Sequence, residues 1–309
     1  MPRNDAERVP VEVEGRVLTL SSLDKVLFPT TRTTKGEALA YIAAVAPALL
    51  AQLADRPVTR VRWPHGTDGE SFFEKNVPPG APEWLPRVSL EAPSSRHGTE
   101  RVTYPLIADL AALTWVTNLG ALELHVPQWR VDASGERCAP DRLVVDLDPG
   151  PGTGLRECAR VALWAREYLA GLGYARTVPV TSGSKGMQLY AVPPAAVPAE
   201  GEGSPREVAR AMAEALQAAH PELVVSSMAK AKRAGKVLLD WSQNTPAKTT
   251  ICPYSLRGKH TTPYVAAPRP WSEVESGAEH GELWQATPDE VVRRLQADGD
   301  LMAALTSGG

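Results

Sequence analysis

Two aspartates two residues apart, Asp146 and Asp148, end an apolar run and are followed by a stretch rich in Pro and Gly. Successive side chains of a β-strand alternate between its faces, so this spacing predicts that both carboxylates point the same way. Two unpaired carboxylates repel each other, and adjacent hard oxygen ligands suit Mg²⁺ or Mn²⁺. A strand that simply ends in an acidic turn would carry the same motif, so the pair does not decide the chemistry alone.

A third carboxylate, Asp240, ends another apolar run inside a cationic part of the chain. Between residues 226 and 260 seven Lys and Arg side chains accompany this single acid, a balance of +6, whereas residues 272–300 carry a balance of −6. A basic segment around one aspartate is typical of a polyanion site with a metal ligand inside it. The alternative interpretation is an ordinary solvated lysine face.

Several other motifs favour phosphate binding. Ser182 and Lys185 lie in a Gly- and Ser-rich turn, where small residues let backbone amides approach an anion; the spacing is not that of a Walker A loop. Arg257 stands beside a glycine, which also suits a phosphate or backbone contact. Lys25 and Lys35 flank the start of a predicted helix, where backbone N–H groups favour anions. A tight hairpin and surface lysines would give the same local patterns.

The elements that must position these groups are predicted from periodicity. Thr34 and Glu37 form a capping box for a helix that Pro47 should kink or divide, and similar signals start helices after Ser204 and Thr287. A helix is expected from Pro105 to Leu119. Other expected elements are a helix over 155–172, strands over 57–63, 121–129, 142–148 and 235–241, and a hairpin over 178–192. His125 shares a strand face with Glu123, and it faces the Asp-x-Asp cleft if the two strands are neighbours.

The adjacent aromatics Phe72 and Phe73 would face opposite ways in a strand, so one can fill the core while the other stays available to stack on a base. The alternative, which is commoner in an arbitrary protein, is that both rings lie in the core. The Pro-rich span from Val77 to Pro93, with the residues up to Gly98, indicates a long loop.

Composition excludes several classes of protein. The 309 residues are 43% hydrophobic and 22% charged with a net charge of −3, as in ordinary globular proteins. The three scattered cysteines, Cys138, Cys158 and Cys252, argue against a zinc site or a disulfide framework. No signal peptide and no apolar run approaching a membrane span are recognised. The prediction is a cytoplasmic, nucleoid-associated protein without a membrane partner.

Three carboxylates together with phosphate-binding groups fit a two-metal phosphoryl-transfer site. The same groups would serve a nucleotidyltransferase, a nuclease or a phosphatase. The ordered motifs add a resemblance: they are similar to those of the polymerase domain of bacterial ligase D, a member of the archaeo-eukaryotic primase superfamily, from about residue 20 to 271. The motifs are His125–Arg130, Val145–Gly150, Thr181–Gly186, Asp240–Asn244 and Tyr254–Gly258.

The resemblance implies a role for each matching residue. Asp146, Asp148 and Asp240 would ligate two Mn²⁺ or Mg²⁺ ions, and Asp240 would help to activate the primer 3′-hydroxyl. The serine matching Ser182 lies near the ribose 2′-hydroxyl in the family, consistent with a preference for ribonucleotides. The residues that match contacts to the incoming nucleotide are Phe73, His125, Ser182, Lys185, Arg233, Gln243 and Arg257.

Lys25 and Lys35 match lysines that hold the 5′-phosphate at the downstream edge of a gap. Relatives often have asparagine three residues before the first of these lysines, where this chain has Ser22. The residues near Arg96, His97 and Arg101 correspond to a variable loop that helps bring DNA ends together.

The fold implied is mixed α/β (α+β), with an RRM-like catalytic core over about 121–271, an N-terminal module over about 1–120 and a C-terminal tail or helix over 272–309, all in one catalytic unit. The expected function is a template-directed, metal-dependent polymerase that uses NTPs or dNTPs to fill gaps and extend overhangs or double-strand-break ends in non-homologous end joining or excision repair. Ku and a DNA ligase are the expected partners. The alternatives are a dedicated primase and a non-catalytic module that bridges DNA ends.

Overall fold

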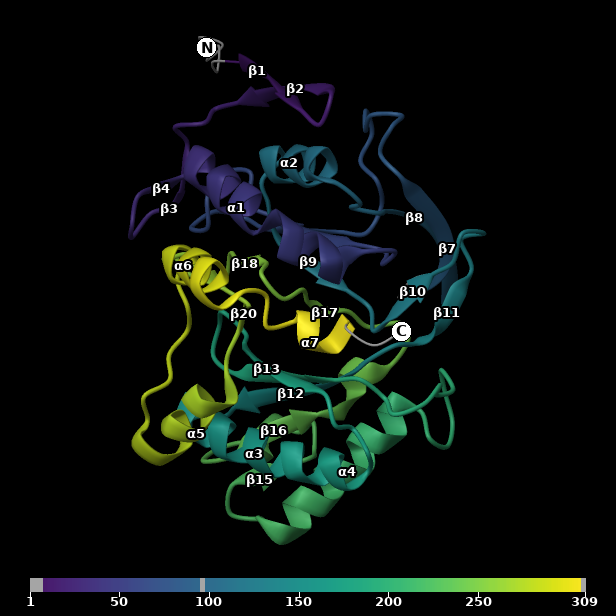
Figure 1. Cartoon of the computed structure of the whole chain (residues 1–309), viewed down its shortest axis with the longest axis vertical. Coiled ribbons are helices and arrows are strands. Elements are labelled where there is room, and N and C mark those ends of the chain that lie inside the picture. Colours follow the sequence, from purple (N-terminus) through teal and green to yellow (C-terminus); the bar gives the residue numbers. More distant parts are fainter. Residues whose placement is uncertain (1–7, 95–97, 307–309) are drawn as a thin grey trace.

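The computed structural model of the chain describes residues 8–94 and 98–306. Figure 1 shows two halves, one above the other. The upper half is a four-stranded sheet with helices α1 (Lys35–Leu53) and α2 (Leu110–Asn118), and the lower half is a six-stranded sheet with α3 (Leu155–Gly171) and α4 (Pro205–Ala219).

The lower sheet has the expected RRM-like topology. Its strands are β12 (Leu143–Pro149), β13 (Thr177–Thr181), β14 (Met187–Ala191) and β16 (Val237–Asp240), with the short edge strands β15 (Val224–Val225) and β20 (Ala267–Pro268). The order β16-β12-β14-β13, with α3 after β12 and α4 after β14, is the βαββαβ arrangement of ferredoxin-like folds. The mixed α/β fold is thus confirmed.

Alternation along β12 sends its side chains into two different environments. Leu143, Val145 and Leu147 are buried in one hydrophobic cluster with α3 and α4. Val144, on the opposite face, is buried in the cluster of the upper half. Asp146 and Asp148 continue that second face along the strand, where it is less covered.

The upper sheet runs β17 (Thr250–Ile251), β9 (Ala121–Val126), β5 (Thr59–Arg62) and β6 (Phe72–Glu74). Strands from both sides of the boundary expected near residue 120 therefore share one sheet. Because β9 pairs with β5 and β17 and not with β12, His125 reaches the site from the opposing sheet, not from a neighbouring strand.

Local signals explain most helix boundaries. Thr34 and Glu37 form the predicted capping box of α1, and Ser204 and Thr287 cap α4 and α6 (Pro288–Asp298). Pro47 does not divide α1, which stays one helix. The helix expected from residue 105 instead begins at residue 110, because strand β8 (Gly98–Pro105) continues to Pro105 and Asp109 caps α2 through Ala112 N.

Among the described residues, α1 is the one helix long and apolar enough to cross a membrane. The expectation that no apolar run approaches that length is therefore wrong for this segment. About 56% of the helix is buried, and Ile42, Leu49 and Leu53 belong to the core of the upper half. A core helix of a globular domain meets the same two criteria.

The Pro-rich span is partly a hairpin, because β7 (Arg87–Ser94) pairs along its whole length with β8. Arg101 is exposed on β8, whereas Arg96 and His97 lie outside the described residues. The other elements are β1 (Arg8–Val13), β2 (Arg16–Ser21), β3 (Val26–Phe28), β4 (Thr33–Thr34), β10 (Trp129–Val131), β11 (Arg137–Pro140), β18 (Leu256–Arg257), β19 (Tyr264–Val265), η1 (Lys230–Lys232), η2 (Trp241–Asn244), α5 (Trp271–His280) and α7 (Ala303–Thr306).

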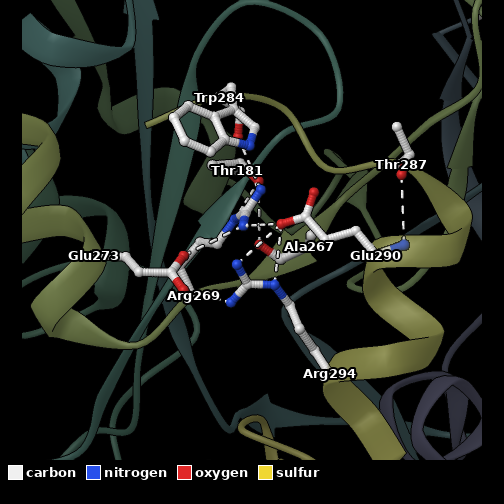
Figure 2. Close-up of polar contacts among 8 residues, drawn as sticks. All are labelled: Thr181, Ala267, Arg269, Glu273, Trp284, Thr287, Glu290 and Arg294. Atoms are coloured by element: carbon white, nitrogen blue, oxygen red, sulfur yellow. Dashed lines mark hydrogen bonds and ion pairs between the residues drawn. The ribbon is translucent and has the colours of Figure 1, made fainter. Parts of the chain in front are cut away.

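The C-terminal segment is held to the lower sheet by a buried arginine (Figure 2). Arg269, which is 2% exposed, donates to Glu290 of α6 at 2.6 Å, to Glu273 of α5 at 3.3 Å and to the Trp284 carbonyl at 2.8 Å. Arg294 completes the cluster through Glu273 and Glu290. The charges of this network compensate one another, as the burial of Arg269 requires.

Candidate active site

A cavity of about 450 Å³, open to solvent, lies between the two sheets at the end of β12. The upper sheet contributes residues of β9 and β17, and the lower half contributes residues of β12, β14 and the turn before β14. The lining residues are His125, Asp146, Asp148, Ser182, Ser184, Lys185, Gln188, Gln243, Thr249, Thr250, Ile251, Arg257 and Lys259.

The three predicted carboxylates share one face of the lower sheet. Asp146 is the direct partner of Asp240 across β12 and β16, and Asp148 lies two residues further on, opposite Leu238. Burial and the neighbouring Asp148 carboxylate raise the pKa of Asp146 to about 7. Burial and the Asp240 carboxylate likewise raise the pKa of Asp148. The negative charge of the aspartates at this end of the cavity is therefore not fully compensated by neighbouring positive groups.

The opposite wall is organised by a carboxylate that the sequence analysis did not assign. Glu123 is 1% exposed; its Oε2 accepts from His125 Nε2 at 2.8 Å and from Arg257 Nη1 at 3.3 Å, and its Oε1 accepts from Gly258 N at 3.1 Å. Burial lowers the pKa of His125 although Glu123 opposes this shift. A neutral ring that donates from Nε2 leaves Nδ1 as an acceptor. Glu123 shares a strand face with His125, and that periodicity was the available signal.

Ser182 and Lys185 line the cavity from the turn between β13 and β14. Ser182 N donates to Gly186 O at 3.0 Å, and Ser182 Oγ accepts from Ser184 N at 3.2 Å. Lys259, which the sequence analysis left out of the nucleotide site, lines the same cavity. Lys185, Arg257 and Lys259 add positive charge to the cavity that Asp146 and Asp148 also line.

Residues 34–302 match the family described as LigD, primase-polymerase domain. The chain belongs to this family. The resemblance to the ligase D polymerase domain that the motifs suggested is thus confirmed.

The curated relatives of this LigD domain are longer proteins. The chain is 48% identical over 297 residues to the multifunctional non-homologous end joining DNA repair protein LigD of Mycobacterium tuberculosis, covering 94% of this chain and 37% of that protein. It is 34% identical over 282 residues to the bifunctional non-homologous end joining protein LigD of Bacillus subtilis, covering 91% of this chain and 43% of that protein. The chain therefore spans less than half the length of these relatives.

Among solved structures, the polymerase domain from Mycobacterium tuberculosis ligase D in complex with DNA superposes with a TM-score of 0.85 at 45% identity. The match covers 94% of this chain and 99% of that chain. The two chains therefore share their fold over nearly their whole length.

The carboxylates of this LigD domain fit divalent metal ions, although not all three already point into the cavity. Asp146 and Asp148 line it, and their raised pKa values mark a site short of positive charge. Asp240 instead caps η2: its Oδ1 accepts from Ser242 N at 3.0 Å and its Oδ2 from Gln243 Nε2 at 2.8 Å. Across the described residues, no three His, Cys, Asp or Glu side chains are gathered as a metal site. Asp240 would have to turn from this cap to join the other two.

Asp146 is oriented by Gln188, a second residue that the sequence analysis did not assign. Gln188 Nε2 donates to Asp146 Oδ1 at 3.0 Å, and its Oε1 lies 3.0 Å from the Tyr190 hydroxyl, which donates to it. An ionised carboxylate only accepts, so Asp146 selects the NH₂ end of the amide; the single Tyr190 hydroxyl proton is shared between Gln188 Oε1 and the Ile251 carbonyl at 2.9 Å. Gln188 is the register partner of Asp146 on β14, which only the pairing of the strands could reveal.

Gln243 and Arg233, two of the residues predicted to contact the incoming nucleotide, lie near the three aspartates. Gln243 lines the cavity and donates to Asp240. Arg233 ends η1, is not among the lining residues and donates to Met228 O at 2.7 Å, yet its positive charge counteracts the raised pKa of Asp148. Arg233 therefore stands near the aspartates without facing the cavity.

Phe73 lies on the edge strand β6, outside the cavity lining, and is 61% exposed. Phe72 is also exposed, at 42%, so the expectation that one of the two aromatics fills the core is wrong. The edge position explains this, because β6 has a neighbour on one side only. Both rings are accessible to solvent.

Lys25 and Lys35 lie close together at the start of α1, outside the cavity lining. Lys25 is exposed and donates to Pro64 O at 3.0 Å, whereas Lys35 is 5% exposed and donates to Ser21 O at 2.6 Å. Burial and the Lys25 charge lower the pKa of Lys35 to about 8. Ser22 adopts a left-handed backbone with φ of 53°.

Proposed function

We propose that this protein is a template-directed, metal-dependent nucleotidyltransferase that fills short gaps and extends DNA ends, with a preference for ribonucleotides. The observation that carries the proposal is the cavity itself, which Asp146 and Asp148 line together with Lys185, Arg257 and Lys259. A nucleoside triphosphate bound there has its phosphates near the cations and its reacting phosphorus near the carboxylates. Membership of the LigD primase-polymerase family supports the same chemistry.

Different residues of the cavity would bind the triphosphate and the ribose of the nucleotide. Lys185, Arg257 and Lys259 neutralise the triphosphate, which needs several cations because it carries several charges. Ser182 and the free Nδ1 of His125 are hydrogen-bonding groups of the kind that read ribose hydroxyls. Glu123 keeps His125 and Arg257 in place through two of its contacts.

Asp146 and Asp148, joined by Asp240, are the groups that would hold Mn²⁺ or Mg²⁺. Such ions, when bound, stabilise the attacking and leaving oxygens of phosphoryl transfer. In their absence the protein keeps Asp146 aligned through Gln188 and keeps the Asp240 carboxylate bonded to η2. The aspartates are thus held beside the cavity before any substrate binds.

The DNA substrate is inferred from the lysine pair and the exposed phenylalanines. Lys25 and Lys35 supply positive charge for a 5′-phosphate at the downstream edge of a gap, and Phe73 offers a ring on which a base can stack. The relatives are named for non-homologous end joining, which supports double-strand-break ends as substrates. Short gaps complete the proposed substrates, and Ku and a DNA ligase are the proposed partners.

Primer extension tests this function directly. A labelled primer facing a short gap is incubated with Mn²⁺ and either NTPs or dNTPs, with and without a 5′-phosphate on the downstream strand. The expected result is incorporation that favours NTPs and increases with the 5′-phosphate. Incorporation only on unprimed single strands, or no incorporation under any condition, would overturn the proposal in favour of a primase or a non-catalytic end-bridging module.

A further inference from the structure

The segment between α5 and α6 reaches the turn that carries Ser182 and Lys185. Gln285 Oε1 accepts from Gly183 N at 2.7 Å, and Gln285 Nε2 donates to Gly186 O at 3.0 Å. One side-chain amide therefore closes both ends of the turn with a donor and an acceptor. Gln285 does not line the cavity, so it acts on the turn from behind.

Gln285 is itself fixed by its neighbours along the chain. Arg269 donates to the carbonyl of Trp284 at 2.8 Å and to Thr181 Oγ1 at 3.3 Å (Figure 2). The same buried guanidinium thus holds the residue before Gln285 and the residue before Ser182. On the other side, Val265 N donates to Ala286 O at 3.0 Å, which ties the segment to β19.

The turn has little freedom on its other side. Gly183 has φ of +69°, and a Cβ built there would lie 2.4 Å from Arg257 Cγ and 2.9 Å from the Val265 carbonyl carbon. The turn therefore rests against Arg257 and β19 while Gln285 holds its backbone polar groups. Its position relative to Arg257 depends on both contacts.

We propose that Gln285 is a positioning residue that sets the Ser182–Gly186 turn for the incoming nucleotide, so that the C-terminal segment helps to determine nucleotide affinity. This inference rests on the proposed function. Without the two hydrogen bonds the turn keeps its hairpin but loses the clamp across its ends. The side chains of Ser182 and Lys185 then adopt the positions required for nucleotide binding in a smaller fraction of the molecules.

The test is Gln285→Leu, which has a similar volume and neither hydrogen-bonding group. Nucleotide KM and kcat are measured on a gapped primer, together with the Kd of the nucleotide on a dideoxy-terminated primer, where no turnover occurs. Loss of two hydrogen bonds predicts a rise in KM and Kd on the order of tenfold, with a much smaller change in kcat. Gapped-DNA affinity should stay at the wild-type value, and Tm should stay within a few degrees of it.

A second readout is independent of catalysis. Amide hydrogen exchange in a peptide covering 181–187 should be faster in Gln285→Leu, because the Gly183 amide loses its acceptor. Gln296→Ala, which removes an exposed glutamine of α6, is the matched control and should change none of these quantities. Gln285→Asn, too short to reach both backbone groups, repeats the test should the leucine variant lower Tm.

Two results contradict the inference. If the nucleotide Kd and the amide exchange rates of residues 181–187 stay within twofold of wild type, the turn keeps its conformation without Gln285. Equal losses of DNA affinity, nucleotide affinity and Tm would show a general structural role. Both presuppose an active wild-type protein, so a wild type that incorporates no nucleotide refutes the proposed function instead.

Discussion

Glu123 accepts a 2.8 Å hydrogen bond from His125, two residues further along β9, and also contacts Arg257 from the following part of the chain. The pKa of Glu123 is lowered because these contacts outweigh its burial, so this buried group is a carboxylate at neutral pH. Glu123 therefore links His125 of β9 and Arg257 of β18, both of which are predicted to contact the nucleotide.

Replacing this carboxylate should impair both stability and nucleotide binding. Glu123→Gln leaves Arg257 buried without its counter-charge, which is expected to cost on the order of 3 kcal/mol in the free energy of unfolding. Urea unfolding and nucleotide KM on a gapped primer are the measurements. Glu136→Gln, an exposed substitution on the β10–β11 turn, should leave both unchanged. A KM equal to that of the wild type would show that His125 and Arg257 keep their positions without Glu123.

Asp148→Asn should separate activity from stability. Incorporation is expected to fall by at least about a hundredfold, because a metal ligand is lost. In a metal-free buffer above pH 7 the variant should unfold at higher urea than wild type, because Asp148 no longer repels Asp146 and Asp240. Unchanged incorporation with Mn²⁺ would exclude Asp148 from the metal site.

The lysine pair should distinguish phosphorylated from unphosphorylated gaps. Lys25→Ala combined with Lys35→Ala is expected to weaken binding of a 5′-phosphorylated gap while barely changing that of the unphosphorylated one, because a phosphate adds charge that only these cations meet. Fluorescence anisotropy with the two DNAs gives the ratio of Kd values. An equal loss on both DNAs would mean that the pair does not bind the phosphate.

The same preference should depend on pH through Lys35. Its pKa of about 8 in the folded protein lies below the usual 10.5, so its ammonium loses its proton as pH rises through 8. Phosphate selectivity should therefore decline between pH 7 and 9, by up to about tenfold if Lys35 dominates. A depressed lysine pKa also means that the unfolded chain binds more protons between pH 8 and 10.5, so this group's contribution to stability rises with pH in that window. A selectivity that is equally strong at both pH values would exclude Lys35.

Ser22 offers a stabilising substitution. Its φ of 53° lies in the left-handed region, which asparagine adopts more readily than serine. Ser22→Asn is therefore expected to raise the free energy of unfolding by up to about 1 kcal/mol. Thermal unfolding checks this, with Ser227→Asn, at a serine without positive φ, as the control. A lower Tm would indicate that Ser22 makes a contact that asparagine cannot.

Local patterns predicted the elements that depend on neighbours in sequence. The alternation of a strand placed Asp146 and Asp148 on one face and Leu143, Val145 and Leu147 on the other, and the capping residues placed the starts of α1, α4 and α6. These features follow from the fixed geometry of strands and helix ends, which each residue shares with its nearest neighbours. The order of the motifs also revealed the family.

Long-range packing decided what the sequence left open. The approach of His125 from the opposing sheet, the pairing of Gln188 with Asp146, and the clamp of Gln285 on Gly183 and Gly186 each join residues far apart in the chain. Such contacts depend on strand register and on how two sheets are stacked, and a local pattern encodes neither. The sequence by itself thus determined which groups this protein has for its chemistry, and the tertiary structure decided which of them meet, because each meeting is stabilised by contacts that exist only once the two halves have packed together.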